Sequence, residues 1–278
     1  MKSFFLCLAA AAAIAGPALA AAPAAPTEAD WRTPDPNNVL VIDTNKGRAI
    51  VELSPEAAPL SAAQVRDLAR AGFYNGRAFF RVVDNFMDQT GDPTDTGTGG
   101  STKPNLPAEF VFKRDATTPM VVVDTQGGRE SGFIGALPVL SQTLALAAMT
   151  ADGKVNAMAD FCGGVVGMAR AQDPASGNSQ FFLMRATQTN LNGQYTAVGR
   201  VIAGMDAVRQ IKVGEPVAAP QDKMLTVRVL ADIPAAERPS VRVIDTRGPW
   251  FTAETARMRA EKLVGLSPCD LDIPSQVK

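Results

Sequence analysis

The sequence predicts a mainly β protein whose strands form an antiparallel barrel. Short runs of β-branched and aromatic residues recur along the chain, and most are bounded by Gly, Asn, Asp or Pro. Two helical stretches interrupt these runs, without the regular strand–helix–strand alternation that builds a parallel sheet. Many short strands with few helices are typical of closed β architectures.

The first elements of the barrel are a hairpin and a helix. Strands are predicted over 39–42 and 48–53, joined by a turn at 45–47 with the sequence Asn-Lys-Gly. Ser61 has the side chain of a helix N-cap and precedes a helical pattern of apolar residues, which Gly72 ends.

The remaining elements of the barrel are short. A strand over 79–83 leads into a loop over 90–100, which is dense in Gly, Thr, Asp and Pro. Three further strands are predicted after it, at 181–184, 196–201 and 224–230. A second, shorter helix is predicted at 205–211.

The N-terminus has the pattern of a secretory signal peptide over 1–20. Lys2 precedes an apolar run over 4–14, and small residues lead to a cleavage site expected after Ala20. The run is shorter than the about 20 residues that a membrane-spanning helix needs, although an uncleaved anchor is the alternative. We therefore expect an exported protein, periplasmic or secreted and without a membrane span after cleavage, whose residues 21–38 form a linker.

Two cysteines, Cys162 and Cys269, remain after cleavage. In an exported protein they are compatible with one disulfide, and two unpaired thiols are the alternative. Histidine is absent from the whole sequence, which excludes Ser-His triads and most zinc sites. A net charge of −1, without runs of Lys or Arg, argues against a nucleic-acid surface.

Arg81 is the most informative single residue. Its neighbours Phe79, Phe80, Val82 and Val83 are apolar, so either face of the strand surrounds the guanidinium with apolar side chains. A buried guanidinium needs a partner, yet no acid stands two residues to either side. We expect an arginine at the rim of an apolar pocket, where it can bind a carbonyl; an internal salt bridge is the alternative.

Three motifs follow one another in a recognisable order. The first, over 79–92, contains Arg81, a Phe-Met pair and a glutamine; the second, over 167–183, ends in Ser-Gln-Phe-Phe-Leu; the third spans 191–201. Together they resemble the signatures of the cyclophilin family of peptidyl-prolyl cis-trans isomerases. The resemblance covers about 39–233 and implies a closed eight-stranded barrel with a helix at each mouth. It also implies proline-containing polypeptides as substrates and no cofactor.

The resemblance assigns the catalytic role to Arg81. It implies that four apolar side chains hold the proline ring: Phe86, Met87, Phe182 and Leu191. It places five other residues along the rest of the substrate: Gln89, Ala169, Arg170, Gln180 and Tyr195. In this group the glutamine at 89 binds the substrate backbone, the segment 169–170 acts through backbone groups, and the tyrosine hydroxyl donates to a carbonyl.

Several positions depart from the family pattern. Phe80 and Tyr195 stand where histidines are common, and Thr90 stands where glycine is usual. Asp84-Asn85 replaces a Pro-Gly turn. Asn190 replaces a bulky aromatic residue, and this loss of stacking area argues against tight binding of cyclosporin.

Two regions lie outside the family pattern. One is an insertion over about 111–162, in which the apolar stretch 139–149 is predicted to form a helix packed on the barrel. Ordinary family decoration and a partner-binding device are its alternative roles. The other is a C-terminal extension over 234–278, with a strand at 241–244 and a helix at 252–264. Alone it could bury little core, so we expect it to pack on the barrel.

The function expected is isomerisation of X-Pro bonds in exported proteins. The alternative is a peptide-binding chaperone or scaffold that kept the pocket and lost turnover. Arg81 favours the enzyme, because a binder gains little from a charge at the pocket rim, whereas the insertion and the tail favour the chaperone. A barrel that binds sugars or lipids has little support, since the chain has only two tryptophans and two tyrosines.

Overall fold

The structure is a computed structural model that describes residues 24–262 and 264–278. The predicted signal peptide lies outside these residues. Eight antiparallel strands form the main sheet, in the order β14-β2-β3-β13-β11-β12-β5-β4. Their bounds are β2 (Val39–Thr44), β3 (Gly47–Leu53), β4 (Arg81–Val83), β5 (Met87–Thr90), β11 (Val165–Met168), β12 (Phe181–Met184), β13 (Ala197–Ala203) and β14 (Met224–Val229).

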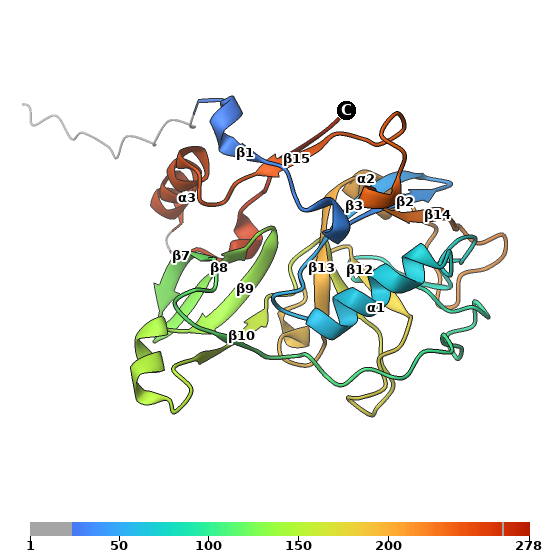
Figure 1. Ribbon diagram of the computed structural model, residues 1–278, viewed down its shortest axis with the longest axis horizontal. Helices are drawn as coiled ribbons and strands as arrows, with labels where there is room; N and C mark the ends of the chain where they lie inside the picture. Colours follow the sequence, from blue (N-terminus) through green and yellow to red (C-terminus); the bar gives the residue numbers. More distant parts are fainter. Residues whose placement is uncertain (1–23, 263) are drawn as a thin grey trace, which may run out of the picture.

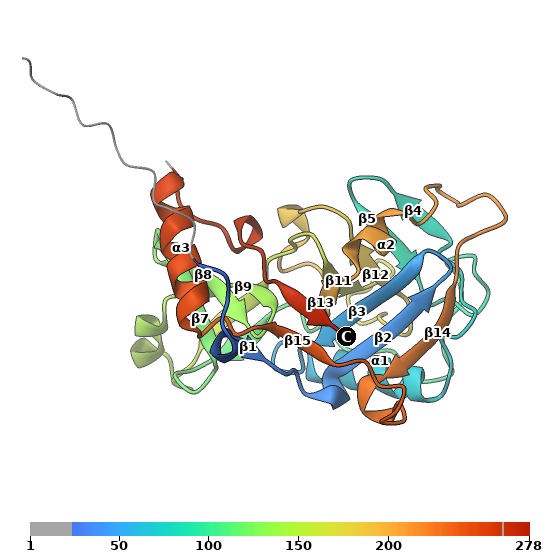
Figure 2. The ribbon, with the colours of Figure 1, turned by 90° about the horizontal axis from the view of Figure 1, so that it is seen from above.

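This sheet is strongly curled (Figures 1 and 2). The predicted antiparallel, mainly β fold is confirmed, whereas a continuous closed ladder is not present in the described residues. The edge strands β4 and β14 do not pair with each other as strands there; a single bridge joins Ala78 to Lys223. Beside it, the amide of Phe79 donates to the Asp222 carbonyl at 2.9 Å.

Helix α1 (Pro59–Arg70) packs against the inside of the curled sheet through its apolar face. It begins two residues before the predicted cap, because Pro59 is suited to the first helical position. Ser61 is therefore not the N-cap. Instead, the carboxylate of Glu109 accepts the free amides of Leu60 and Ser61, at 2.9 and 2.8 Å. The second predicted helix, α2 (Met205–Arg209), is also present.

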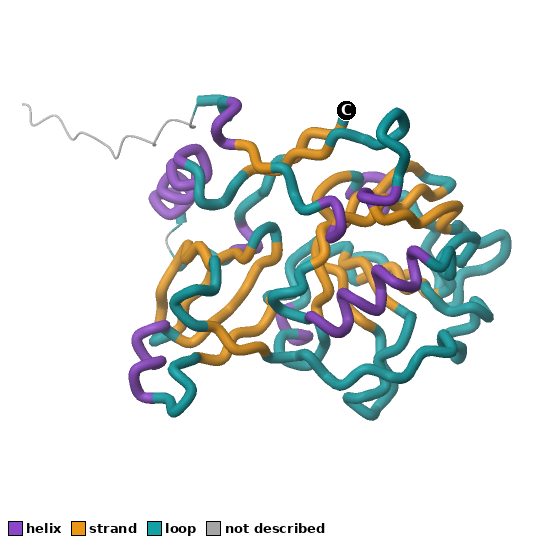
Figure 3. Tube along the Cα trace, in the orientation of Figure 1, coloured by secondary structure: helices purple, strands orange, loops and turns teal. Residues whose placement is uncertain are grey.

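The insertion forms a second antiparallel sheet beside the first (Figures 1 and 3). Its order is β6-β10-β9-β8-β7, with β6 (Phe112–Arg114), β7 (Met120–Gln126), β8 (Arg129–Ile134), β9 (Leu137–Gln142) and β10 (Val155–Ala159). The helix predicted over 139–149 is wrong. β8 and β10 pair with the two edges of β9, and this pairing holds Leu137–Gln142 as a strand. Only the 3-10 segment η3 (Leu144–Met149) follows.

The two ends of the described chain form a third sheet, with the order β1-β15-β16. Its strands are β1 (Trp31–Arg32), β15 (Val241–Ile244) and β16 (Ser275–Val277). The segment expected as a linker thus contributes β1, preceded by η1 (Glu28–Asp30) and followed by η2 (Pro36–Asn38). Val241 and Val243 of β15 share a buried cluster with Val39 and Val41, so the tail packs on the main sheet.

Helix α3 (Pro249–Glu261) of the tail packs on the insertion sheet, where the rings of Phe251 and Phe133 meet edge to face at 5.5 Å. A disulfide between Cys162 and Cys269, with the Cα atoms 5.0 Å apart, joins the tail to the end of the insertion. In the described part of the chain, no helix has the length and apolar character needed to cross a bilayer.

Candidate active site

The hairpin of β4 and β5 positions two of the predicted site residues. The register pairs Arg81 directly with Gln89, which brings their side chains to the same face of the sheet. Asp84 and Asn85 form the turn, and Asn85 adopts a φ of 55°, a left-handed conformation that asparagine tolerates. The replacement of the usual Pro-Gly pair therefore preserves a tight hairpin.

Nine of the ten predicted site residues line one pocket of about 120 Å³. They come from the hairpin, from the segment after β11, from β12, and from η4 (Thr189–Leu191) and the loop after it. The members are Arg81, Phe86, Met87, Gln89, Ala169, Arg170, Phe182, Leu191 and Tyr195. Met87, Phe182 and Leu191 are buried, and the Phe182 ring contacts the Tyr195 ring edge to face at 5.6 Å. These side chains give the pocket apolar walls.

The guanidinium of Arg81 contacts both the residues of the pocket and a carboxylate at the protein surface. On the pocket side, Nη1 lies 3.4 Å from Gln89 Oε1 and 3.9 Å from Met87 Sδ, and the group lies 5.9 Å from the centre of the Phe86 ring. Nε donates to Glu215 Oε1 at 2.5 Å. Glu215 is more than half exposed, so this ion pair is at the protein surface. Arg81 is both a pocket residue and a member of a salt bridge.

Gln180, the tenth predicted residue, lies beside the pocket. Its Oε1 accepts from Gln89 Nε2 at 2.9 Å, and its own amide donates to the carbonyls of Gly97 and Gly99. It lines a neighbouring cavity of about 230 Å³, which also contains Gln89, Ala169 and Arg170. Gln180 thus braces Gln89 and does not enter the apolar pocket.

Arg170 forms the opposite rim through its side chain. Its guanidinium lies 4.7 Å from the centre of the Tyr195 ring and 5.4 Å from that of Phe110, distances typical of cation–π contacts. Its Nε also donates to the Gln194 carbonyl at 3.1 Å. The backbone amide of Ala169 already donates to the Gln180 carbonyl at 2.9 Å, so this amide is occupied.

A buried ion pair lies on the opposite face of β5 from Gln89. Asp88 has no exposed surface, and its carboxylate lies 3.5 Å from Nη1 of the buried Arg185. Burial raises the pKa of Asp88 to about 7, and the Arg185 charge opposes this rise only in part. Sequence patterns gave no sign of this pair.

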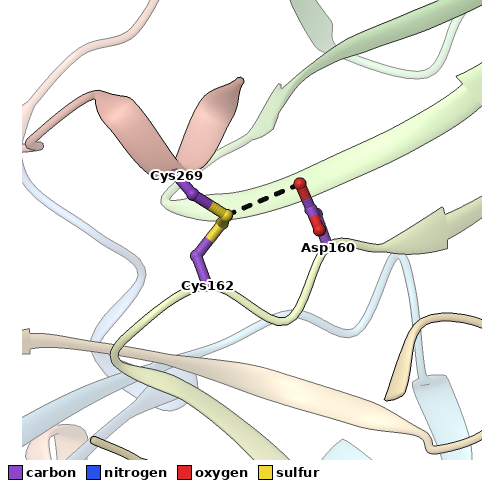
Figure 4. Close-up of side chains that lie close together, drawn as sticks. All are labelled: Asp160, Cys162 and Cys269. Atoms are coloured by element: carbon purple, nitrogen blue, oxygen red, sulfur yellow. Dashed lines mark hydrogen bonds between the residues drawn. A yellow bond between two sulfur atoms is a disulfide. The ribbon is translucent and has the colours of Figure 1, made fainter. Parts of the chain in front are cut away.

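The loop that carries Leu191 is fixed by Asn192. The side chain of Asn192 accepts from the Phe161 amide and donates to Asp160 Oδ1, both at 2.8 Å. Asp160 Oδ2 in turn lies 3.6 Å from Cys269 Sγ of the disulfide (Figure 4). Burial raises the pKa of Asp160, and its hydrogen bond with Asn192 opposes this rise. One pocket wall is thereby linked to the disulfide.

Asp160, Cys162 and Cys269 also place three atoms that can ligate a metal within 4.8 Å of one another. The two sulfur atoms are bonded to each other, however, and thiolates are the form in which cysteine binds metals. In its disulfide form this cluster is therefore a structural link.

Comparison with known proteins gives a consistent result. The family model described as "Cyclophilin type peptidyl-prolyl cis-trans isomerase/CLD" matches residues 39–231. A probable peptidyl-prolyl cis-trans isomerase of Brucella suis is 37% identical over 191 residues, which are 65% of this chain and 74% of the relative. Peptidyl-prolyl cis-trans isomerase-like 1 of Aspergillus fumigatus is 32% identical over 172 residues, covering 62% of this chain and 80% of the relative.

A solved structure is similar over a larger part of the chain. The crystal structure of cyclophilin AquaCyp293 from Hirschia baltica superposes with a TM-score of 0.82 at 34% sequence identity. The match covers 89% of this chain and 93% of that one. The similarity therefore extends beyond the residues that the family model matches.

Proposed function

The chain belongs to the cyclophilin-type peptidyl-prolyl cis-trans isomerases, and we propose that it isomerises X-Pro bonds of exported polypeptides with Arg81 as the catalytic residue. Arg81 carries this assignment because its Nη1 faces the apolar pocket, beside Gln89 and Met87. The ion pair with Glu215 uses Nε and leaves the donors on Nη1 directed toward the pocket.

The reaction requires no nucleophile and no proton transfer. The C–N bond of an X-Pro peptide has partial double-bond character, and the barrier to rotation is ~18–20 kcal/mol. A site accelerates rotation when it binds the twisted amide more tightly than either planar form. Twisting localises the lone pair on the proline nitrogen, and a hydrogen-bond donor aimed at that nitrogen or at the rotating carbonyl stabilises the twisted state.

Different pocket residues hold the proline ring, bind the substrate backbone and stabilise the twisted amide. Met87, Phe182 and Leu191 form the apolar surface that holds the pyrrolidine ring while the preceding carbonyl turns. Arg81 supplies the donor through the N–H groups of its guanidinium. Gln89, braced by Gln180, is placed to bind the substrate backbone.

Export is supported by the leader-like N-terminus and by the disulfide. Disulfides persist in oxidising compartments and are rare in the cytosol of most cells. Cell fractionation and the mass of the purified mature protein test this part of the proposal. We expect a periplasmic or secreted protein that begins at Ala21 and has no free thiol. A full-length protein in the cytosol would contradict it.

The isomerase assignment is tested with a short peptide that contains one proline. We expect Arg81→Ala to lower kcat/KM by about 10²–10³-fold, the range found when one transition-state donor is removed, with the fold and the affinity for the peptide retained. Equal rates for the variant and the wild type would exclude the role of Arg81. A wild type that binds the peptide without turnover would favour the chaperone alternative.

A further inference from the structure

The insertion sheet has an apolar groove of about 380 Å³ on one face. Leu140 and Met158 lie opposite each other on β9 and β10, and Val111 and Leu146 complete the apolar lining. Val111 is 49% exposed and Leu146 is 38% exposed, and Met149, in the same η3 segment as Leu146, is 84% exposed. The volume is within the range of ligand-binding clefts.

These apolar side chains are not needed for the core of the sheet. Alternate residues of the same strands, such as Val139 and Ala159, point to the other face and are buried in the cluster that includes Phe182 and Leu191 of the proline pocket. The sheet therefore packs one face on the barrel and leaves apolar groups on the other. Exposed apolar clefts of this kind mark surfaces that bind a partner.

The groove begins where the proline pocket ends, and two contacts establish this. The Arg170 guanidinium lies over both the Tyr195 ring of the pocket and the Phe110 ring, and the residue after Phe110 is Val111 of the groove. The second contact involves the loop that carries Leu191 and Tyr195.

In that loop, a Cβ placed on Gly193 would lie 3.1 Å from Met158 Sδ. The Met158 side chain, which lines the groove, therefore packs against the loop whose other residues line the pocket. The two cavities have adjoining walls.

We propose that this groove binds an apolar segment of the same polypeptide whose proline occupies the pocket. The inference rests on the proposed isomerase function and adds a substrate class to it: unfolded chains with apolar residues flanking the proline, which native proteins bury. Met158 gives the groove a flexible, polarisable wall, and methionine-lined surfaces accept many different sequences.

Chain length decides which substrates reach the groove. A tetrapeptide spans at most about 14 Å when extended, whereas ten residues span about 35 Å. A short peptide that fills the proline pocket therefore has little chain left for the groove, whereas a long chain can fill both sites. The second contact is then intramolecular and raises the occupancy of the pocket.

The experiment compares two substrates with two variants. The groove variant combines Val111→Glu and Leu146→Glu, which place charges at exposed positions. The control is Leu225→Glu, whose side chain is 53% exposed. Its strand, β14, lies at the opposite end of the molecule from the insertion sheet (Figures 1 and 2). Each protein is assayed with a proline tetrapeptide and with an unfolded protein whose refolding is limited by one X-Pro bond. Circular dichroism and thermal melts verify the fold.

We expect the groove variant to keep kcat/KM for the tetrapeptide within twofold and to lose at least fivefold in catalysed refolding, while the control loses neither. Unchanged refolding in the groove variant would overturn the inference, as would equal losses on both substrates. A wild-type dimer that the groove substitutions dissociate would also overturn it, by making a second copy the occupant. A wild type inactive on the tetrapeptide would refute the proposed function itself.

Discussion

Glu215 binds the guanidinium of Arg81 through Nε at 2.5 Å, while Nη1 of the same group lies 3.4 Å from Gln89 Oε1 in the pocket. Glu215 belongs to a segment fastened to β4, since Gly214 and Val82 exchange two backbone hydrogen bonds of 2.8 Å. The backbone that carries Glu215 is therefore held beside β4, and from there its carboxylate reaches the arginine. We interpret Glu215 as a positioning residue for the catalytic donor.

Glu215→Gln keeps the shape of the side chain and removes its charge. We expect kcat/KM to fall by up to about fivefold, equivalent to ~1 kcal/mol, the upper end for an exposed ion pair, and the melting temperature to change little. Salt screens exposed charges, so added salt should lower the wild-type rate toward that of the variant. The matched control is Glu237→Gln, an exposed partner of Arg228 outside the pocket. Equal salt dependence in all three proteins would contradict the positioning role.

The buried Asp88 predicts a pH dependence of stability. Its pKa is about 7 in the folded protein and near 3.8 without burial, so between these values the folded state holds a proton that the unfolded chain releases. The free energy of unfolding therefore decreases as pH rises through this window, by up to about 1.4 kcal/mol per pH unit. Above pH 7, Asp88 is ionised in both states and its contribution no longer changes with pH.

Asp88→Asn should remove that slope, because the amide does not titrate. Urea denaturation of the wild type and the variant across this pH window measures it. Asp67→Asn, at an exposed site on α1, is the control that should keep the slope. If the unfolding free energies of the wild type and of Asp88→Asn depend on pH in the same way between pH 4 and pH 7, Asp88 is ionised in the folded protein throughout this range.

Six strands of the main sheet and both of its helices could be predicted because each has a local signal, whereas β5 and β11 were not predicted as strands. The helices and strands predicted there are present; their ends are displaced by no more than two residues, except that α1 begins three residues before the position that a cap at Ser61 implies. The insertion was harder, because a short apolar run such as 139–149 fits either a strand or a buried helix. Residues 137–142 form a strand because they pair with β8 and β10, and no local sequence pattern encodes this pairing.

The pocket residues could be predicted because they lie within contiguous motifs. Glu215 could not, because 134 residues separate it from Arg81 and only the folding of the chain makes them neighbours. The pairing of Asp88 with Arg185 was missed for the same reason. The absence of an acid two residues from Arg81 did not exclude a salt bridge, because a strand contacts segments that are distant in the sequence.

The disulfide predicts a large contribution to stability. It closes a loop with a sequence separation of 107 residues, and in the chain-entropy model a loop of this size restricts the unfolded state strongly. We expect Cys162→Ser combined with Cys269→Ser to lose about 2–5 kcal/mol of unfolding free energy, measured in urea. Reduction of the wild type should reproduce the loss. Identical denaturation midpoints for oxidised and reduced protein would refute this contribution.

Asn192 predicts a link between the insertion and substrate affinity. Its side chain holds the Leu191 loop to the Phe161 amide and to Asp160, and Asn192→Ala removes both hydrogen bonds. Each is worth about 1 kcal/mol, so the pocket wall should loosen and KM for a proline peptide should rise several-fold. Asn190→Ala is the matched control, because Asn190 accepts a hydrogen bond from the Gln194 side chain (Nε2) through its backbone carbonyl, which the substitution retains. Asn192 has no role in positioning the wall if both variants leave KM unchanged.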